Sequence, residues 1–424
     1  MNVTALVLAV AALGGVVVIR RVRRDTLFTL SLALIVILIA TSMVLYPEPS
    51  FKAAERGLGV WWEVVLPALL PFFIAAELLM GMGVVHFMAV LCQPIMRPVF
   101  NVPGSGSFTM AMGIASGYPL GAALSARLKD TGLATKTEAE RLMCFCNTSD
   151  PLFMTGAVAV GMFRRADVAA AIVTAHYISA VLVGLAMRFW KMREKPSPLL
   201  QSDGSFILLR AYRAMRDAQR EKPQPFGKLM GEAVNRSVNT LMAVLGFMVL
   251  FSVIFELLRI AGATEVISQA ITRVIPDSLI PKALHEPLVS GFFEITIGTS
   301  MASQAAAPLV ARVAACSAII AWSGLSVLAQ VAAVTQPSGL SVLPYAFARF
   351  FQGIMAAILT VLIMKPGAVR WSLPTFEPYT AEGSLVWLEN MGLAAKSCVV
   401  SVLAVAVVSL IGLALYETVR RKKA

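Results

Sequence analysis

Long apolar runs alternate with short polar segments along most of the chain, and their lengths predict membrane-spanning helices. A helix needs about 17 to 25 apolar residues to cross roughly 30 Å of hydrocarbon. The pattern predicts an all-α polytopic membrane protein with about nine transmembrane helices. The runs are Val3 to Ile19, Leu27 to Tyr46, Val60 to Met82, Leu142 to Phe163, Ala166 to Met187, Val238 to Leu258, Val313 to Val334, Val342 to Met364 and Ser397 to Tyr416.

Two further apolar stretches are interrupted by glycine, proline and polar residues. They cover Phe108 to Leu128 and Pro287 to Leu309. Irregular backbone at membrane depth is tolerated only where protein or a water-filled cavity satisfies its polar groups. We therefore expect two re-entrant hairpins, each entering and leaving the membrane on one side.

Positive charge is distributed unevenly over the predicted loops. With the N-terminus outside, the inner loops hold 24 Lys and Arg and the outer loops hold 10. Lys and Arg are enriched in cytoplasmic loops. The sequence thus predicts an outside N-terminus and a cytoplasmic C-terminus.

Pairs of similar residues recur in the two halves of the chain. Gly117 and Gly291 are 174 residues apart, as are Ser149 and Ser323. Further pairs upstream recur at offsets of 178 to 179, namely Gly83 with Gly262, Pro98 with Pro276 and Pro103 with Pro281. The pattern indicates an internal duplication. Because the predicted spans place the copies in opposite orientation, we expect an inverted-topology repeat with a substrate site near the midplane.

The expected organisation follows from this repeat. An amphipathic helix near Phe206 to Arg220 should lie on the membrane surface or bind a partner. The short amphipathic stretch Val84 to Met96 should lie at the membrane interface. Trp371 and Trp387 should anchor an outer loop at the interface. The segments are two transmembrane helices (1–59), a first repeat (60–190), a cytoplasmic basic linker (191–236), a second, inverted repeat (237–365), and an outer loop with a C-terminal transmembrane helix (366–424).

Composition agrees with a membrane protein. The chain is 58% hydrophobic and 14% charged, with a mean hydropathy of +0.77, whereas soluble domains contain about 25% charged residues. Because the net charge of +12 lies mostly in loops beside spans, we expect no nucleic-acid partner. The five cysteines lie in apolar surroundings and are expected to be buried thiols. The three histidines are scattered, so neither a metal nor another cofactor is expected.

The segment Asn147 to Pro151 interrupts an apolar run with polar residues. Proline removes a backbone donor and disfavours helix at Asp150. One interpretation is a local kink, capped by Ser149 and Asp150 at the start of a new helix. The other adds a binding site, in which the N-terminus of the half-helix attracts an anion or the carbonyls before it hold a cation.

Two carboxylates stand out within the apolar stretches. Asp150 and Glu294 each carry a cost of about 2.5 to 3.5 kcal/mol on insertion scales and usually line a polar pathway. We expect them to contribute to a site coupled to a proton or to a cation such as sodium. Either could instead pair with Arg127 or Arg312. Glu77 could also line the pathway.

Glycines at positions 113, 117 and 121 form a small-xxx-small ladder. Such ladders permit close approach of helices. Packing is the favoured role for the ladder, and Gly117, beside Tyr118-Pro119, is the expected tip of a hairpin.

Several runs resemble the YlbJ family of sporulation integral membrane proteins. They are GYPLGA, ERLMCFCNTSDPLFMTGAVAVGM, FGKLMGEAVNRSVNTLMAVLGFMVLFSVIFELL and GFFEITIG. The resemblance covers roughly residues 60 to 365. It implies the domain named for nucleoside recognition, or gate domain, which is distantly similar to concentrative nucleoside transporters. It also implies movement of dipicolinic acid across the outer forespore membrane. One departure is Asp150, where the family implies a small residue, often glycine.

The polar interruption at Ser116 to Pro119, together with the positions that match the family, gives the expected substrate-binding residues. They are Ser116, Gly117, Tyr118, Asn147, Thr148, Ser149, Asp150, Gly291, Phe293, Glu294, Thr296 and Ser323. The expected function is a membrane transporter of a small polar or anionic metabolite, dipicolinic acid first. A nucleoside or other small metabolite is the alternative, and a non-transporting assembly or sensor protein is a further one. No enzyme is expected, since P-loop, HExxH and GxSxG motifs are absent. Membrane lipid and the substrate are the expected partners. The sequence is compatible with a homo-oligomer but does not predict one.

Overall fold

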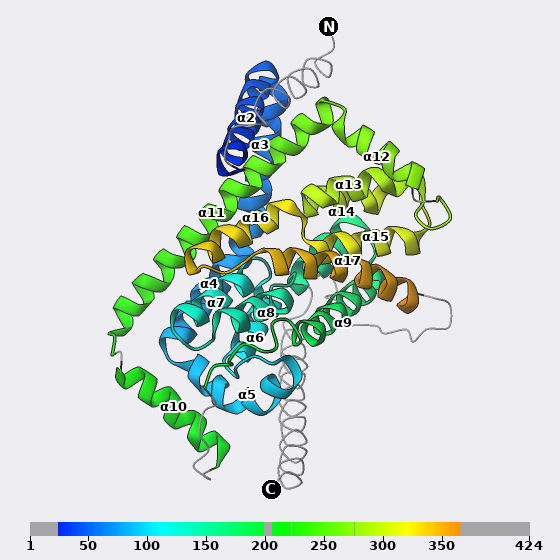
Figure 1. The fold of residues 1–424 in the computed structure, drawn as a ribbon. Coiled ribbons are helices and arrows are strands. Elements are labelled where there is room, and N and C mark those ends of the chain that lie inside the picture. Colours follow the sequence, from blue (N-terminus) through cyan, green and yellow to red (C-terminus); the bar gives the residue numbers. More distant parts are fainter. Residues whose placement is uncertain (1–23, 199–205, 222, 275, 365–424) are drawn as a thin grey trace, which may run out of the picture.

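The computed structural model describes residues 24–198, 206–221, 223–274 and 276–364, and every element in these ranges is helical (Figure 1). The predicted all-α class is therefore confirmed. The spans expected at Val3 to Ile19 and Ser397 to Tyr416 lie outside the described residues, as do Trp371 and Trp387. The count of nine spans consequently stays a prediction.

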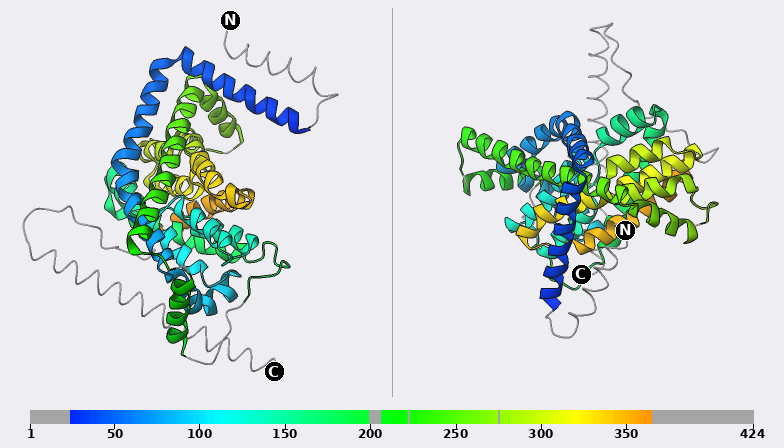
Figure 2. Two further views of the ribbon diagram at one scale, coloured as in Figure 1. Left: turned by 90° about the vertical axis from the view of Figure 1, so that its left-hand side faces the viewer. Right: turned by 90° about the horizontal axis from the view of Figure 1, so that it is seen from above.

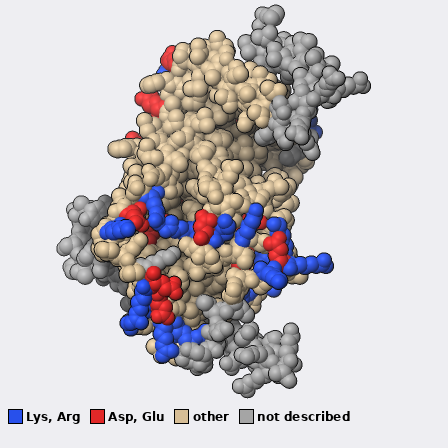
Figure 3. Space-filling view, turned by 60° about the vertical axis from the view of Figure 1, so that its left-hand side comes forward, with Lys and Arg blue, Asp and Glu red and all other residues tan. Residues whose placement is uncertain are grey.

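Four helical segments are long and apolar enough to cross a membrane, or up to six if each of two bent helix pairs is one span. Figure 3 shows a broad uncharged surface above a band of mixed charges, as expected for a membrane-embedded body. The four are Ala166–Met187, Phe226–Ile260, Leu309–Ser338 and Leu343–Ile363. The bent pairs are Thr29–Leu45 with Pro47–Glu63 (105°) and Leu69–Gly81 with Val84–Phe100 (83°).

Both halves contain the same succession of elements: a first helix, an amphipathic helix, a pair of short helices, a broken helix and a closing helix. This order agrees with the predicted duplication. The first half comprises α4 (Leu66–Gly81), α5 (Val84–Phe100), α6 (Gly106–Ser116), α7 (Leu120–Asp130), α8 (Lys136–Cys146), η2 (Phe153–Met162) and α9 (Ala169–Met187). The second comprises α11 (Phe226–Ile260), α12 (Ala263–Val274), α13 (His285–Phe293), α14 (Ile295–Gln304), α15 (Leu309–Trp322), α16 (Gly324–Thr335) and α17 (Leu343–Ile363).

The ends of corresponding helices also agree. Gly83 after α4 and Gly262 after α11 both adopt the left-handed conformation, with φ of 77° and 72°, which glycine adopts without steric cost. In the view of Figure 1, α6 to α8 lie below α13 to α15. The apolar core forms two main clusters, and Tyr118 packs against both of them.

Three helices lie outside this repeated order. Helices α2 (Arg24–Leu45) and α3 (Pro47–Val60) extend from one end, where α3 packs along α11 (Figures 1 and 2). Helix α10 (Ile207–Glu221) packs against α5 and buries Ala211 while Tyr212 stays exposed. The helix expected near Phe206 to Arg220 is therefore present, and its place on a membrane surface stays a prediction.

The run Leu142 to Phe163, expected as one span, is divided in the structure. Helix α8 ends at Cys146, and helical structure resumes at Pro151, which leads into the π-helical η2. Proline cannot donate a backbone hydrogen bond and disfavours helix in the residue before it. The polar interruption is thus a true break.

The short helices α6 and α7 hold the end of α8 through glycines. A Cβ atom added at Gly113 or Gly121 would lie 2.0 or 2.4 Å from the carbonyl oxygen of Cys146. Only glycine therefore fits at these two positions. The predicted packing role of the ladder is confirmed there, while Gly117 sits at the turn between α6 and α7, as expected for a hairpin tip.

We expect Gly121→Ala to lower the thermal midpoint of unfolding, because the added methyl group overpacks the backbone of the break at a cost of about 1 to 3 kcal/mol. Gly246→Ala is the matched control, since a Cβ there meets nothing within 4 Å. In helix α11 this second change should leave the midpoint unchanged or raised, because alanine favours helix by about 1 kcal/mol over glycine. Equal midpoints for the two variants, measured in detergent, would contradict the close packing.

Candidate functional site

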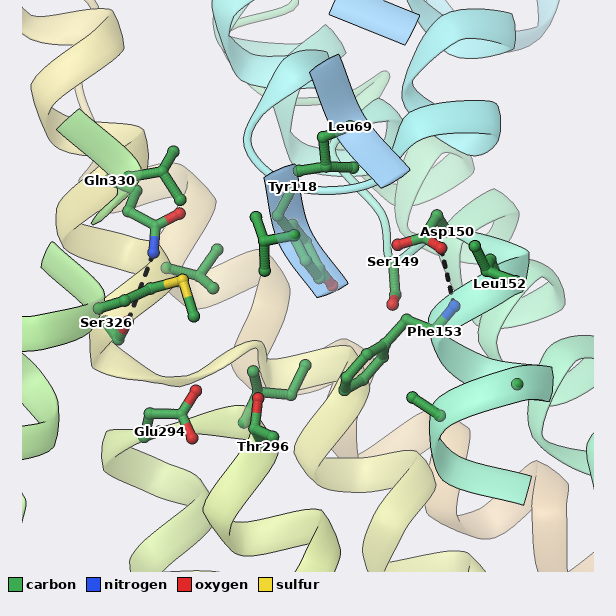
Figure 4. A pocket seen from close by; sticks show the side chains of 17 residues that line it. Leu69, Tyr118, Ser149, Asp150, Leu152, Phe153, Glu294, Thr296, Ser326 and Gln330 are labelled. Carbon is green, nitrogen blue, oxygen red and sulfur yellow. Dashed lines mark hydrogen bonds between the residues drawn. The ribbon is translucent and has the colours of Figure 1, made fainter. Parts of the chain in front are cut away.

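A pocket with a cavity volume of about 360 Å³ lies between the two halves. Small-molecule sites span about 300 to 1,000 Å³. Most of its wall is apolar, with a few polar groups, and Figure 4 shows Asp150 and Glu294 on opposite sides of it. Its lining residues are Val65, Leu69, Tyr118, Ser149, Asp150, Leu152, Phe153, Gly156, Ala157, Val244, Met248, Glu294, Ile295, Thr296, Ser326, Val327 and Gln330.

Each carboxylate in the pocket caps the helix that follows it. The N–H of Phe153 donates to Asp150 Oδ1 at 2.8 Å, and the N–H of Ile297 donates to Glu294 Oε2 at 2.7 Å. Acidic side chains at such positions satisfy backbone donors that lack a helical partner. The helix start at Asp150, where one interpretation of the sequence placed an anion, is therefore already capped by a carboxylate of the chain itself.

Neither pocket carboxylate forms an ion pair with Arg127 or Arg312. Arg127 and Arg236 lie 3.7 and 3.2 Å from Glu77 Oε2, and the guanidinium of Arg312 lies over the ring of Phe163, 5.5 Å from its centroid. Glu77, Arg127 and Arg236 line a second, more polar cavity of about 250 Å³. The alternative pairing considered from the sequence is thus not found.

Of the expected binding residues, the pocket brings together Tyr118, Ser149, Asp150, Glu294 and Thr296. Gly117 lies directly behind Asp150, since a Cβ there would be 2.7 Å from Asp150 Oδ2. The remaining expected residues are not among those that line the pocket: Ser116, Asn147, Thr148, Gly291, Phe293 and Ser323.

Asn147 holds the break together from behind the pocket. Its Oδ1 accepts from the N–H of Ala122 at 3.3 Å, and its Nδ2 donates to the hydroxyl of Tyr345 at 2.8 Å. Thr148 donates to the carbonyl of Gly113 at 3.4 Å. Because these contacts join three helices, Asn147→Ala would disturb the break itself and would not distinguish a binding role from a structural one. A residue on the pocket wall is the better test.

Ser149 is fixed by two residues of α9. Its N–H donates to His176 Nε2 at 3.1 Å, and its carbonyl accepts from the hydroxyl of Tyr177 at 3.1 Å. These contacts leave the side chain of Ser149 pointing into the pocket (Figure 4).

Sequence reasoning missed Ser326, Gln330 and Arg349. The first two lie on the pocket wall, on successive turns of α16. Arg349 lies behind Tyr118, with its guanidinium carbon 5.6 Å from the centroid of that ring. An arginine inside an apolar run is itself a sign of a functional site, so Arg349 could have been found from the sequence.

The fold defines a polytopic helical membrane protein whose two halves share one order of elements and enclose a pocket beside the break after α8 and the turn between α13 and α14. A family model described as nucleoside recognition (Gate) matches residues 62–186. The sporulation integral membrane protein YlbJ of Bacillus subtilis (strain 168) is 41% identical over 347 residues, which cover 82% of this chain and 85% of the relative. The chain therefore belongs to the YlbJ family of sporulation integral membrane proteins, as the sequence motifs predicted. No solved structure matches the chain.

Proposed function

We propose that the chain transports a small polar metabolite, with dipicolinic acid moved across the outer forespore membrane as the first candidate. The observation that carries this proposal is the pocket between the two halves, beside the break after α8 and the turn between α13 and α14. Transporters built from inverted repeats bind substrate at such a place. The sporulation role named for the relative supports the cellular setting. The proposal includes an outside N-terminus, a cytoplasmic C-terminus and no enzymatic activity.

The pocket offers both apolar walls and donors for a planar aromatic substrate. Leu69, Phe153 and Val244 supply apolar surface, while Ser149 and Gln330 supply polar groups. A dianion would be repelled by two ionised carboxylates. A proton on one of them, or a cation that travels with the substrate, would remove this repulsion, which is why we retain coupling to a proton or cation.

A nucleoside is the second candidate, and one observation favours it. Asp150 and Glu294 form no ion pair with any other described residue, so they can accept hydrogen bonds from an uncharged substrate. The description of the matching family model as nucleoside recognition agrees with this candidate. If neither dipicolinic acid nor a nucleoside is transported, a non-transporting assembly or sensor role is the remaining candidate.

Uptake into proteoliposomes tests the proposal with a matched pair of glutamine variants. Gln330 lines the pocket, and its Nε2 lies 3.4 Å from Ser326 Oγ. Gln304 is exposed and makes the same contact with Ser300, also at 3.4 Å. We expect Gln330→Leu to lower uptake of labelled dipicolinate or nucleoside at least about fivefold, the usual worth of one lost hydrogen bond. Gln304→Leu should transport like the parent. Equal uptake by the two variants would contradict a role of this pocket.

A further inference from the structure

Arg349 of α17 is fully buried, at 0% exposure, among the ends of helices from both halves. Its Nη1 donates to the carbonyl of Ala321 at 3.3 Å and lies 3.4 Å from the hydroxyl of Tyr118. Its Nη2 donates to the carbonyls of Asn147 and, at 3.3 Å, Cys144. No carboxylate of the described residues forms an ion pair with it. Its charge is therefore balanced by carbonyl oxygens and by the rings of two tyrosines.

Two of these carbonyls belong to corresponding positions of the duplication. Asn147 and Ala321 are 174 residues apart, the same separation as between Gly117 and Gly291. Asn147 follows the last residue of α8, and Ala321 lies in the last turn of α15. The guanidinium thus binds the carboxyl ends of the two equivalent half-helices, one from each half of the chain.

Carbonyls at the end of a helix lack a helical partner and carry partial negative charge. In transporters with broken helices, such carbonyls commonly coordinate the coupling sodium ion. A guanidinium, with five donors in a planar fork, satisfies several carbonyls at once and stays charged at any physiological pH. Arg349 supplies from α17 the positive charge that a free cation would otherwise bring.

We propose that Arg349 is a built-in cation that joins the two helix breaks and replaces a coupling sodium ion at their carbonyls. This inference rests on the proposed transport function and narrows the choice of coupling species. If Arg349 occupies the carbonyl ends, no sodium ion binds there. The coupling species is then a proton, or a cation that binds with substrate in the pocket. Arg349 acts as a positioning residue: it reaches the pocket only through Tyr118, whose hydroxyl also donates to the carbonyl of Ile320 at 3.0 Å.

The first test measures stability without substrate, so its result does not depend on whether the transport proposal is right. Arg349→Ala leaves the carbonyls without a cation, and we expect about 10 mM guanidinium chloride to raise its thermal midpoint by about 2 °C or more over equal potassium chloride. The parent and Arg312→Ala, which removes another arginine of the second half, should show no such gain. Absence of a specific gain in Arg349→Ala would overturn the proposal.

A second pair of variants covers the case in which the alanine variant does not fold. Arg349→Lys keeps a positive charge, whereas Arg349→Met keeps similar length without charge. We expect the lysine variant to have the higher thermal midpoint, and a methionine variant of equal stability would show that the carbonyls need no cation. Replacing sodium by potassium should not change the thermal midpoint of the parent in the absence of substrate. A parent that is stabilised by sodium would also overturn the inference.

Discussion

Asp150→Asn combined with Glu294→Gln is expected to abolish accumulation of substrate against a gradient while the protein stays folded. Both amide side chains retain an oxygen that can accept from the N–H groups of Phe153 and Ile297, and asparagine is about as good an N-cap as aspartate. What the double variant loses is the ability to ionise and to take up a proton or cation. We expect accumulation driven by an imposed proton gradient to fall at least about tenfold, equivalent to about 1.4 kcal/mol.

The measurement is uptake into proteoliposomes with and without the gradient, beside the thermal midpoint of each variant. Asp167→Asn is the control, because this exposed carboxylate pairs with Arg165 away from the pocket. Asp150→Ala distinguishes the capping role of Asp150 from the role of its charge. Unlike asparagine, alanine has no oxygen to accept from the N–H of Phe153. This variant should therefore lower the free energy of unfolding by about 1 kcal/mol. Gradient-driven accumulation that survives in the double variant would exclude these carboxylates from coupling.

The features predictable from the sequence are those set by local chemistry. The break at Asn147 to Pro151 was predictable because proline and the residue before it restrict the backbone whatever surrounds them. The turn at Gly117 and the left-handed ends at Gly83 and Gly262 follow likewise from the freedom of glycine. The all-α class follows from the length of the apolar runs.

The contacts that could not be predicted join residues that are distant in the chain. Asn147 was expected in the binding site, but its amide binds Tyr345, 198 positions away. A short polar side chain in a break looks the same in sequence whether it faces a pocket or a neighbouring helix. Gln330 escaped notice for the converse reason, because nothing next to it in the chain marks which face of α16 meets the pocket. Side-chain direction around a break depends on packing, which the pattern alone does not contain.

The capping role of Asp150 was considered from the sequence, but its consequence for the substrate was not. Once the carboxylate accepts from the N–H of Phe153, the start of that helix no longer offers a free positive end to an anion. The donors left for a substrate are side chains such as Ser149 and Gln330. We therefore expect recognition of the proposed substrate to depend on side-chain hydrogen bonds more than on helix dipoles.

Filling the pocket tests its role without touching any charge. Ala157 and Val160 both lie in η2, but Ala157 lines the pocket whereas Val160 is 51% exposed on the outside of the fold. A tryptophan at position 157 would project its large ring into the cavity, whose volume is about 360 Å³. Because the ring occupies space that substrate needs, we expect Ala157→Trp to lower uptake at least about tenfold, a cost of about 1.4 kcal/mol in binding.

The control is Val160→Trp, which adds the same ring to the same helix on the side that faces away from the pocket. It should transport within about twofold of the parent, since exposed substitutions usually change stability by less than 0.5 kcal/mol. Ala157→Leu should give an intermediate rate, because it fills less of the cavity. Thermal midpoints of all three variants separate blocked transport from misfolding. If Ala157→Trp is folded and transports like the parent, the substrate does not pass through this pocket, and the second, polar cavity around Glu77 and Arg127 becomes the place to look.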